Sequence, residues 1–81
     1  MREYTTELLA VQVFGFCLNK SRTIEEITKR VYGNSNAKNI NRVYQCCQIL
    51  MSHGVLIPKF VNRELRFQID GGIIDKNKLG V

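Results

Sequence analysis

The sequence predicts a single α+β domain in which three helices precede a two-stranded β-hairpin. Residues 6–53 show helical spacing of apolar side chains together with capping signals, whereas residues 55–70 show the alternation that is typical of strands. A chain of 81 residues has room for one small core. We expect the domain to span residues 1–70, followed by a C-terminal tail over 71–81 that is either mobile or a short extra element.

The first helix is expected over residues 6–18, with Thr5 or Thr6 as its cap. Its apolar residues fall on nearly every side, which is typical of a helix at the centre of a core or at a subunit interface. Val11, Phe14 and Leu18 cannot all face one small core, and uncovered they would form an unusually large apolar patch. We therefore expect a homodimer with these three residues in its interface.

The second and third helices are marked by their ends. Thr23 and Glu26 form a capping-box pattern, and Gly33 is a typical left-handed stop. After a polar turn over 34–36, the third helix is expected over residues 37–53. Apolar residues at i, i+3, i+4 and i+7 predict its core stripe, formed by Ile40, Val43, Tyr44, Cys47, Leu50 and Met51.

The hairpin is predicted from residues 55–61 and 64–70, joined by a tight turn at Asn62 and Arg63. Pro58 confines the first strand to a sheet edge or a bulge. In the second strand, strict alternation turns Phe67 and its apolar neighbours inward.

The charge balance favours an acidic partner. Twelve Lys and Arg stand against seven Asp and Glu, giving a net charge of +5 and a pI of about 9.4, which fits nucleic acid. The side of the third helix opposite its core stripe has no carboxylate and consists of Lys38, Asn41, Arg42, Gln45, Ile49 and Ser52. Arg reads guanine, Asn and Gln read adenine, and Lys suits phosphate.

Further basic residues lie in the hairpin. Lys59, Arg63 and Arg66 are candidates for phosphate contacts, although charged residues also protect hairpin edges from pairing. Asn36 is first a helix cap, and the backbone N–H groups beside it are a second candidate for phosphate binding.

This order of elements resembles the winged-helix family of DNA-binding proteins, whose short polar turn joins a helix-turn-helix pair. The resemblance covers residues 6–70 and rests on the motif of residues 23–27, the turn of 33–36, the core stripe of the third helix and the helix–Gly–strand junction of 52–57. It implies that the third helix enters the major groove, while the hairpin, or wing, touches the DNA backbone or minor groove. The chain also resembles small winged-helix proteins of crenarchaeal viruses and plasmids. We expect a cytoplasmic location, which is the cytoplasm of the host cell for a viral protein.

The sequence thus predicts sequence-specific binding of double-stranded DNA by a small homodimeric transcription regulator. The alternative is a winged-helix adaptor that binds proteins and does not read DNA, because fold alone does not separate the two. We expect no enzymatic activity, cofactor, small-molecule substrate or membrane association, since neither a catalytic constellation nor a long apolar run is present.

The three cysteines do not form a metal-ligand pattern, and no metal site is expected. Cys47 lies on the predicted core stripe, whereas Cys46 is expected near the edge of its helix and accessible. Cytosolic thiols are usually reduced. A disulfide between subunits through Cys46, or alternatively Cys17, would nevertheless be geometrically feasible near a two-fold axis.

Overall fold

The computed structural model describes residues 4–70, which form an α+β domain of three helices and a three-stranded antiparallel sheet. The predicted tail over 71–81 lies outside the described residues. Along the chain the elements are α1 (Thr6–Cys17), β1 (Arg22–Thr23), α2 (Ile24–Tyr32), α3 (Ala37–Ser52), β2 (Leu56–Val61) and β3 (Glu64–Ile69).

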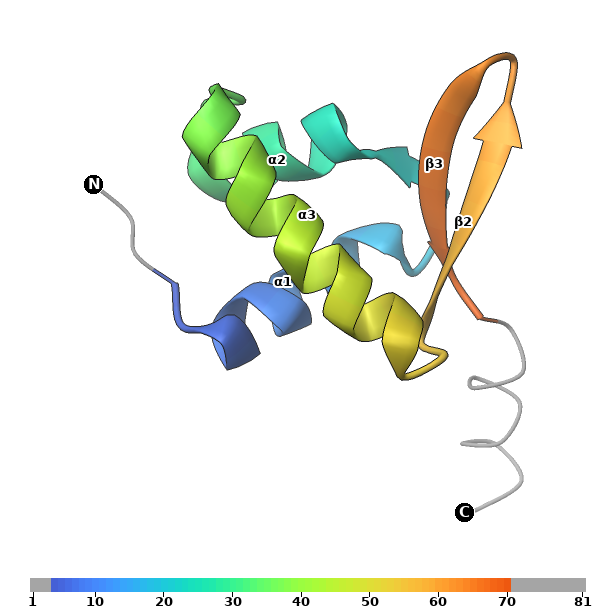
Figure 1. Ribbon diagram of the computed structural model, residues 1–81, viewed down its shortest axis with the longest axis horizontal. Helices are drawn as coiled ribbons and strands as arrows, with labels where there is room; N and C mark the ends of the chain where they lie inside the picture. Colours follow the sequence, from blue (N-terminus) through green and yellow to red (C-terminus); the bar gives the residue numbers. More distant parts are fainter. Residues whose placement is uncertain (1–3, 71–81) are drawn as a thin grey trace.

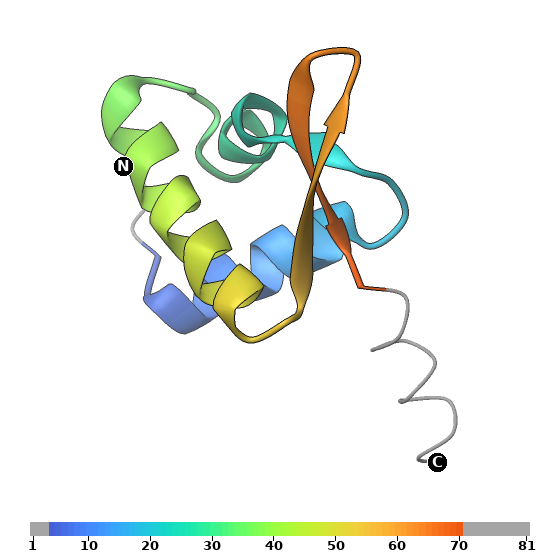
Figure 2. The same cartoon turned by 45° about the vertical axis from the view of Figure 1, so that its right-hand side comes forward.

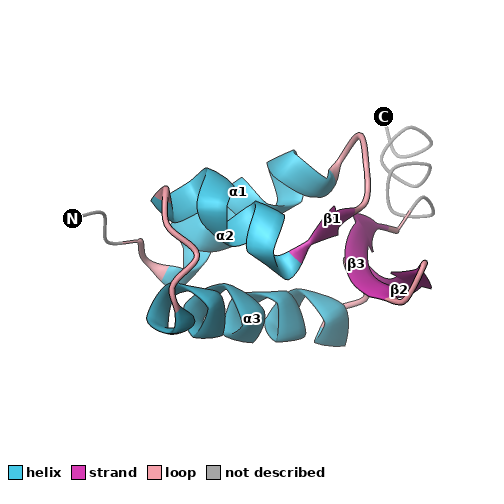
Figure 3. Ribbon diagram, turned by 90° about the horizontal axis from the view of Figure 1, so that it is seen from above, coloured by secondary structure: helices cyan, strands magenta, loops and turns pink. Residues whose placement is uncertain are grey.

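The helices form two layers and the sheet closes one end. In Figure 3, α1 and α2 lie on one side of the molecule and α3 on the other, with β2 nearest the α3 side. The β2–β3 hairpin projects past the helices in Figure 1, and the view in Figure 2 shows how strongly its two strands twist around each other. α3 and β2 are therefore presented on the same side of the domain.

The ends of the helices follow the predicted capping signals. The Glu26 backbone N–H donates to Thr23 Oγ1 at 3.1 Å, and the Thr23 N–H donates to Glu26 Oε1 at 2.9 Å, which completes the capping box. The hydrogen bond from the Thr23 backbone is the main cause that lowers the pKa of Glu26. Gly33 ends α2 at a φ of 79°, and Asn36 begins α3 by accepting from the Asn39 N–H at 2.9 Å.

The sheet contains one strand more than the predicted two-stranded hairpin. Arg22 and Thr23 form β1 and pair with Phe67 and Arg66 of β3, so that β3 is central and β2 lies at an edge. Two residues are too few to show a strand period, which is why the pattern did not reveal β1. Pro58 lies on the edge strand, as its missing N–H requires.

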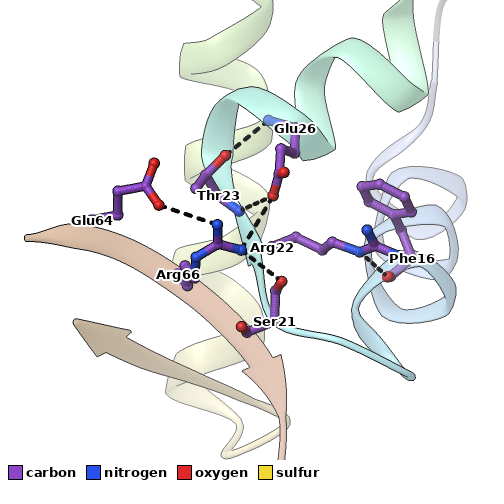
Figure 4. A network of polar contacts seen from close by, with 7 residues as sticks. All are labelled: Phe16, Ser21, Arg22, Thr23, Glu26, Glu64 and Arg66. Atoms are coloured by element: carbon purple, nitrogen blue, oxygen red, sulfur yellow. Dashed lines mark hydrogen bonds and ion pairs between the residues drawn. The ribbon is translucent and has the colours of Figure 1, made fainter. Parts of the chain in front are cut away.

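Arg66, predicted as a phosphate contact, is engaged in contacts within the protein. Its guanidinium group donates to the Ser21 carbonyl at 3.0 Å and to Glu64 Oε1 at 3.1 Å, and it lies 3.5 Å from Glu26 Oε1 (Figure 4). Its side chain is only 21% exposed. Arg66 thus joins β3 to the N-terminus of α2, and both carboxylates near it are used in this contact.

The core lies between the three helices and the sheet, with Phe67 as the largest fully buried side chain. Its buried apolar residues are Leu9, Val13, Cys17, Ile27, Val31, Val43, Cys46, Cys47, Leu56, Phe67 and Ile69. All of the predicted inward residues of β3 belong to this core or pack against it.

The predicted accessibility of Cys46 is also wrong, because Cys46 is only 3% exposed. Cys17 is buried as well, and all three thiols are free. Burial raises the pKa of Cys17 to about 11 and that of Cys47 to about 12, and it raises the pKa of Cys46. A bridge through Cys46 or Cys17 would require the core to open, so the thiols serve as packing residues here.

Candidate nucleic-acid interface

The outer face of α3 is rotated from its predicted position. Val43, Cys46 and Cys47 are its buried residues, whereas Tyr44 is 40% exposed. At 100° per residue this moves the centre of the buried side by roughly 50° from the predicted stripe. Gln48, which sequence reasoning left out, therefore joins the residues that point away from the core. The exposed polar residues centred on this side are Lys38, Asn41, Gln45, Gln48 and Ser52.

Arg42 lies at the flank of this face and not at its centre. It is exposed, and its Nη2 donates to the Tyr4 carbonyl at 3.0 Å. Tyr4 in turn donates from its hydroxyl to the Val31 carbonyl at 3.2 Å and packs edge-on against Tyr32 at 5.4 Å. Arg42 therefore ties α3 to the segment before α1, so one of its guanidinium nitrogens is already used within the protein.

The hairpin extends the basic surface beyond α3. Lys59 and Arg63 are exposed. Phe60, which lies between them in the sequence, is 75% exposed because the hairpin extends beyond the helices. Phe60 pairs with Leu65 across the hairpin, on the same side of the sheet as the buried Leu56. The end of the hairpin thus combines two cations with an exposed aromatic ring.

The turn of the hairpin holds its residues in the left-handed region. Asn62 and Arg63 have φ values of 51° and 68°, the arrangement that a two-residue type I′ turn needs. Asn tolerates this region, whereas a left-handed residue with a long side chain costs about 1–2 kcal/mol. The chain keeps an arginine where glycine would be easier.

We expect Arg63→Gly to change stability and nucleic-acid binding in opposite directions. Relief of the left-handed strain, less the added freedom of the unfolded chain, should raise the free energy of unfolding by about 0.5–1 kcal/mol. If Arg63 contacts a phosphate, the salt dependence of DNA binding should fall by about one unit of slope. Urea unfolding measures the first effect, and Lys59→Gln is the control that should alter only the second. A lower free energy of unfolding for Arg63→Gly would contradict the argument that the left-handed conformation of Arg63 is strained.

The charged residues of α3, β2 and the hairpin turn are all positive. Residues 37–63, which span α3, β2 and the hairpin turn, contain four Lys and Arg and no Asp or Glu. All four cations are exposed. Glu64, the first carboxylate after this stretch, is paired with Arg66. Such a surface attracts polyanions more strongly than the mixed charges on α2 do.

Asn36 lies in the turn between α2 and α3 and is exposed. Its side-chain oxygen is used as the α3 cap, and the Asn39 side chain donates to the Asn34 carbonyl at 3.0 Å, which fixes the turn. These two hydrogen bonds within the chain fix the turn. Asn36 at the N-terminus of α3 and the nearby Lys38 are both exposed to solvent.

A second surface lies on α1. Val11 is 65% and Leu18 is 43% exposed, as expected for the predicted dimer residues, but Phe14 is half-buried and packs against the core. Leu8, at 54% exposure, takes its place in the outward stripe. Sequence reasoning could have found Leu8, because residues 8, 11, 15 and 18 share one side at a spacing of three and four.

Comparison with known proteins gives no match for this chain among protein-family models, curated proteins or solved structures. Within residues 4–70, no group of three His, Cys, Asp or Glu side chains is placed to hold a metal ion. None of the helices in the same range has the length and apolar character needed to cross a membrane.

Proposed function

We propose that this protein is a winged helix-turn-helix domain that binds double-stranded DNA in a sequence-specific manner and acts as a small transcription regulator. The observation that carries the proposal is the surface formed by the outer side of α3, which has no carboxylate, together with the cations Lys59 and Arg63 at the end of the hairpin, where the carboxylate of Glu64 is paired with Arg66. The arrangement of α2, a short capped turn and α3, followed by a projecting hairpin, supports the winged-helix assignment.

In this proposal α3 lies in the major groove. Asn41, Gln45 and Gln48 then face base edges, for which carboxamides suit adenine, and Lys38 faces phosphate. Lys59 and Arg63 reach the backbone beside the groove, with Phe60 between them. Arg42, held by Tyr4, serves chiefly as a phosphate contact at the flank.

Two copies acting together would match a palindromic operator with half-sites about one helical turn apart. The outward apolar stripe of α1 supports a homodimer, since it is exposed on each copy and lies on the side of α1 opposite its buried residues. Such a dimer would leave the DNA-binding side of each copy free.

The decisive experiment is the salt dependence of DNA binding. If each subunit neutralises about four to six phosphates, log K should fall against log salt with a slope of about −4 to −5 per subunit. Fluorescence anisotropy with a labelled duplex, at several salt concentrations, measures this slope. The matched control replaces Lys29 by Gln on α2, away from the proposed surface, and should leave the slope nearly unchanged. No retention at low salt would refute the proposal.

One observation favours an adaptor as the second candidate function. Phe60, Ile57 and Val61 are exposed on the edge strand β2, where an added strand from another protein would find free backbone groups and apolar contacts. Binding of this kind would respond weakly to salt, so the same titration separates the two functions.

A further inference from the structure

One side of α1 carries an apolar stripe that the described residues leave uncovered. Leu8, Val11, Gly15 and Leu18 are all exposed and fall within roughly 80° of one another around the helix. They lie opposite the buried Leu9, Val13 and Cys17. α1 therefore has two apolar sides, and only one of them is used by this domain.

Gly15 makes a hollow in the middle of this stripe. A Cβ atom added there would meet nothing within 4 Å, so the domain itself gives no steric reason for glycine inside a helix. Glycine at a helix interior is unfavourable. A close approach by something outside the described domain is the remaining steric reason for glycine at this position.

The hollow continues into an open groove of about 540 Å³ between α1 and α2, beside Gly15, Gln12 and Asn19. The guanidinium group of Arg22 lies 4.0 Å over the Phe16 ring at one wall, and Arg30 lies 5.9 Å from the same ring. None of the lining residues carries a carboxylate. The groove is thus lined by the cations Arg22 and Arg30 and, on the α1 side, by the apolar Val11.

We propose that the occupant of this surface is a second copy of the chain, with the two α1 helices packed antiparallel and the two-fold axis passing midway between Val11 and Gly15. This inference rests on the homodimer of the proposed function and specifies its interface. In this arrangement Val11 of each copy fills the hollow over Gly15 of the other, and Leu8 meets Leu18. The stripe is self-complementary, as a two-fold contact requires.

Charge selects the antiparallel orientation. Glu7 lies in the first turn of α1, whereas Lys20 and Arg22 follow its C-terminal end. Antiparallel packing places the acidic end of each helix beside the basic end of the other and opposes the two helix dipoles. Parallel packing would instead place Glu7 beside Glu7 of the second copy.

The test is to fill the hollow, using the full chain without DNA. Gly15→Ala should raise the thermal midpoint of unfolding at protein concentrations low enough for the chain to be monomeric. The reason is that the added Cβ meets no atom within 4 Å and alanine favours a helix. The same change should weaken the dimer at least tenfold by sedimentation velocity. Gly15→Gln, also a good helix former, should weaken it further. The control is Glu25→Asp on the exposed side of α2, which keeps the negative charge in the first turn and should change neither quantity appreciably.

Three results would overturn the inference. The first is a full chain that is monomeric at 100 µM, which is on the order of the concentration that a weak single-helix contact requires. The second is a dimer that Gly15→Gln leaves intact. The third is a monomer that associates only after residues 71–81 are deleted. The last would mean that the chain's own C-terminal segment covers the stripe. Because no DNA is present, each of these results leaves the DNA-binding proposal standing, and a failure to bind DNA leaves the dimer standing.

Discussion

Phe67→Ala is expected to remove at least about a quarter of the free energy of unfolding of the protein. Phe67 is fully buried in the central strand, where β1 and β2 pair on either side of it. Truncation of such a ring costs about 3–5 kcal/mol, from lost burial and from the cavity left behind. A domain of this length has a total stability of only about 4–12 kcal/mol. Urea unfolding followed by circular dichroism measures the loss.

Phe60→Ala is the matched control, with the same chemistry on the same side of the hairpin. Phe60 is 75% exposed, so its replacement should change the free energy of unfolding by less than about 0.5 kcal/mol. Phe67→Leu, which keeps most of the volume, should lie between the two. Equal losses for Phe60→Ala and Phe67→Ala would mean that the hairpin end is covered, against the exposure seen here.

The helix ends and the hairpin were predictable because each rests on a local rule. The capping box of Thr23 and Glu26, the left-handed Gly33 and the turn at Asn62 and Arg63 depend on residues only a few positions apart. β1 was not predictable, since Arg22 and Thr23 become a strand only through their partners in β3, more than forty residues away. The same holds for Arg66, whose partners include Ser21 and Glu26.

The candidate site was predictable in composition but not in its exact orientation. The absence of carboxylates on the outer side of α3 follows from the sequence alone. Its rotation does not, because hydropathy ranks Tyr44 with the core and gives no reason to bury both Cys46 and Cys47. Packing decides this: small thiols fit where α1 approaches α3, and the larger tyrosine is left at the boundary with solvent.

This rotation changes which residues should read DNA. The sequence alone includes Arg42 with Gln45 among the candidate readers, whereas in the structure Gln48 shares the outer side of α3 with Gln45, and Arg42 is held at the flank by the Tyr4 carbonyl. We therefore expect Gln45→Ala and Gln48→Ala each to lose about 1–3 kcal/mol of discrimination between operator and random DNA, which is roughly 5- to 150-fold. The double variant should retain only the sequence-independent binding that the cations supply.

Arg42→Ala provides the contrast, since it should weaken binding to operator and random duplexes by a similar factor and reduce the salt slope by about one. Parallel anisotropy titrations on a selected operator and on a random duplex separate the two behaviours. Urea unfolding of each variant is needed as a control, because Arg42 also bonds Tyr4, whereas Gln45 and Gln48 are exposed on the helix. If Arg42→Ala alone abolishes discrimination and Gln48→Ala changes nothing, then α3 contacts DNA through the face that the sequence predicts, which includes Arg42. If neither glutamine affects discrimination, α3 is not the reading helix, and the hairpin becomes the element to examine.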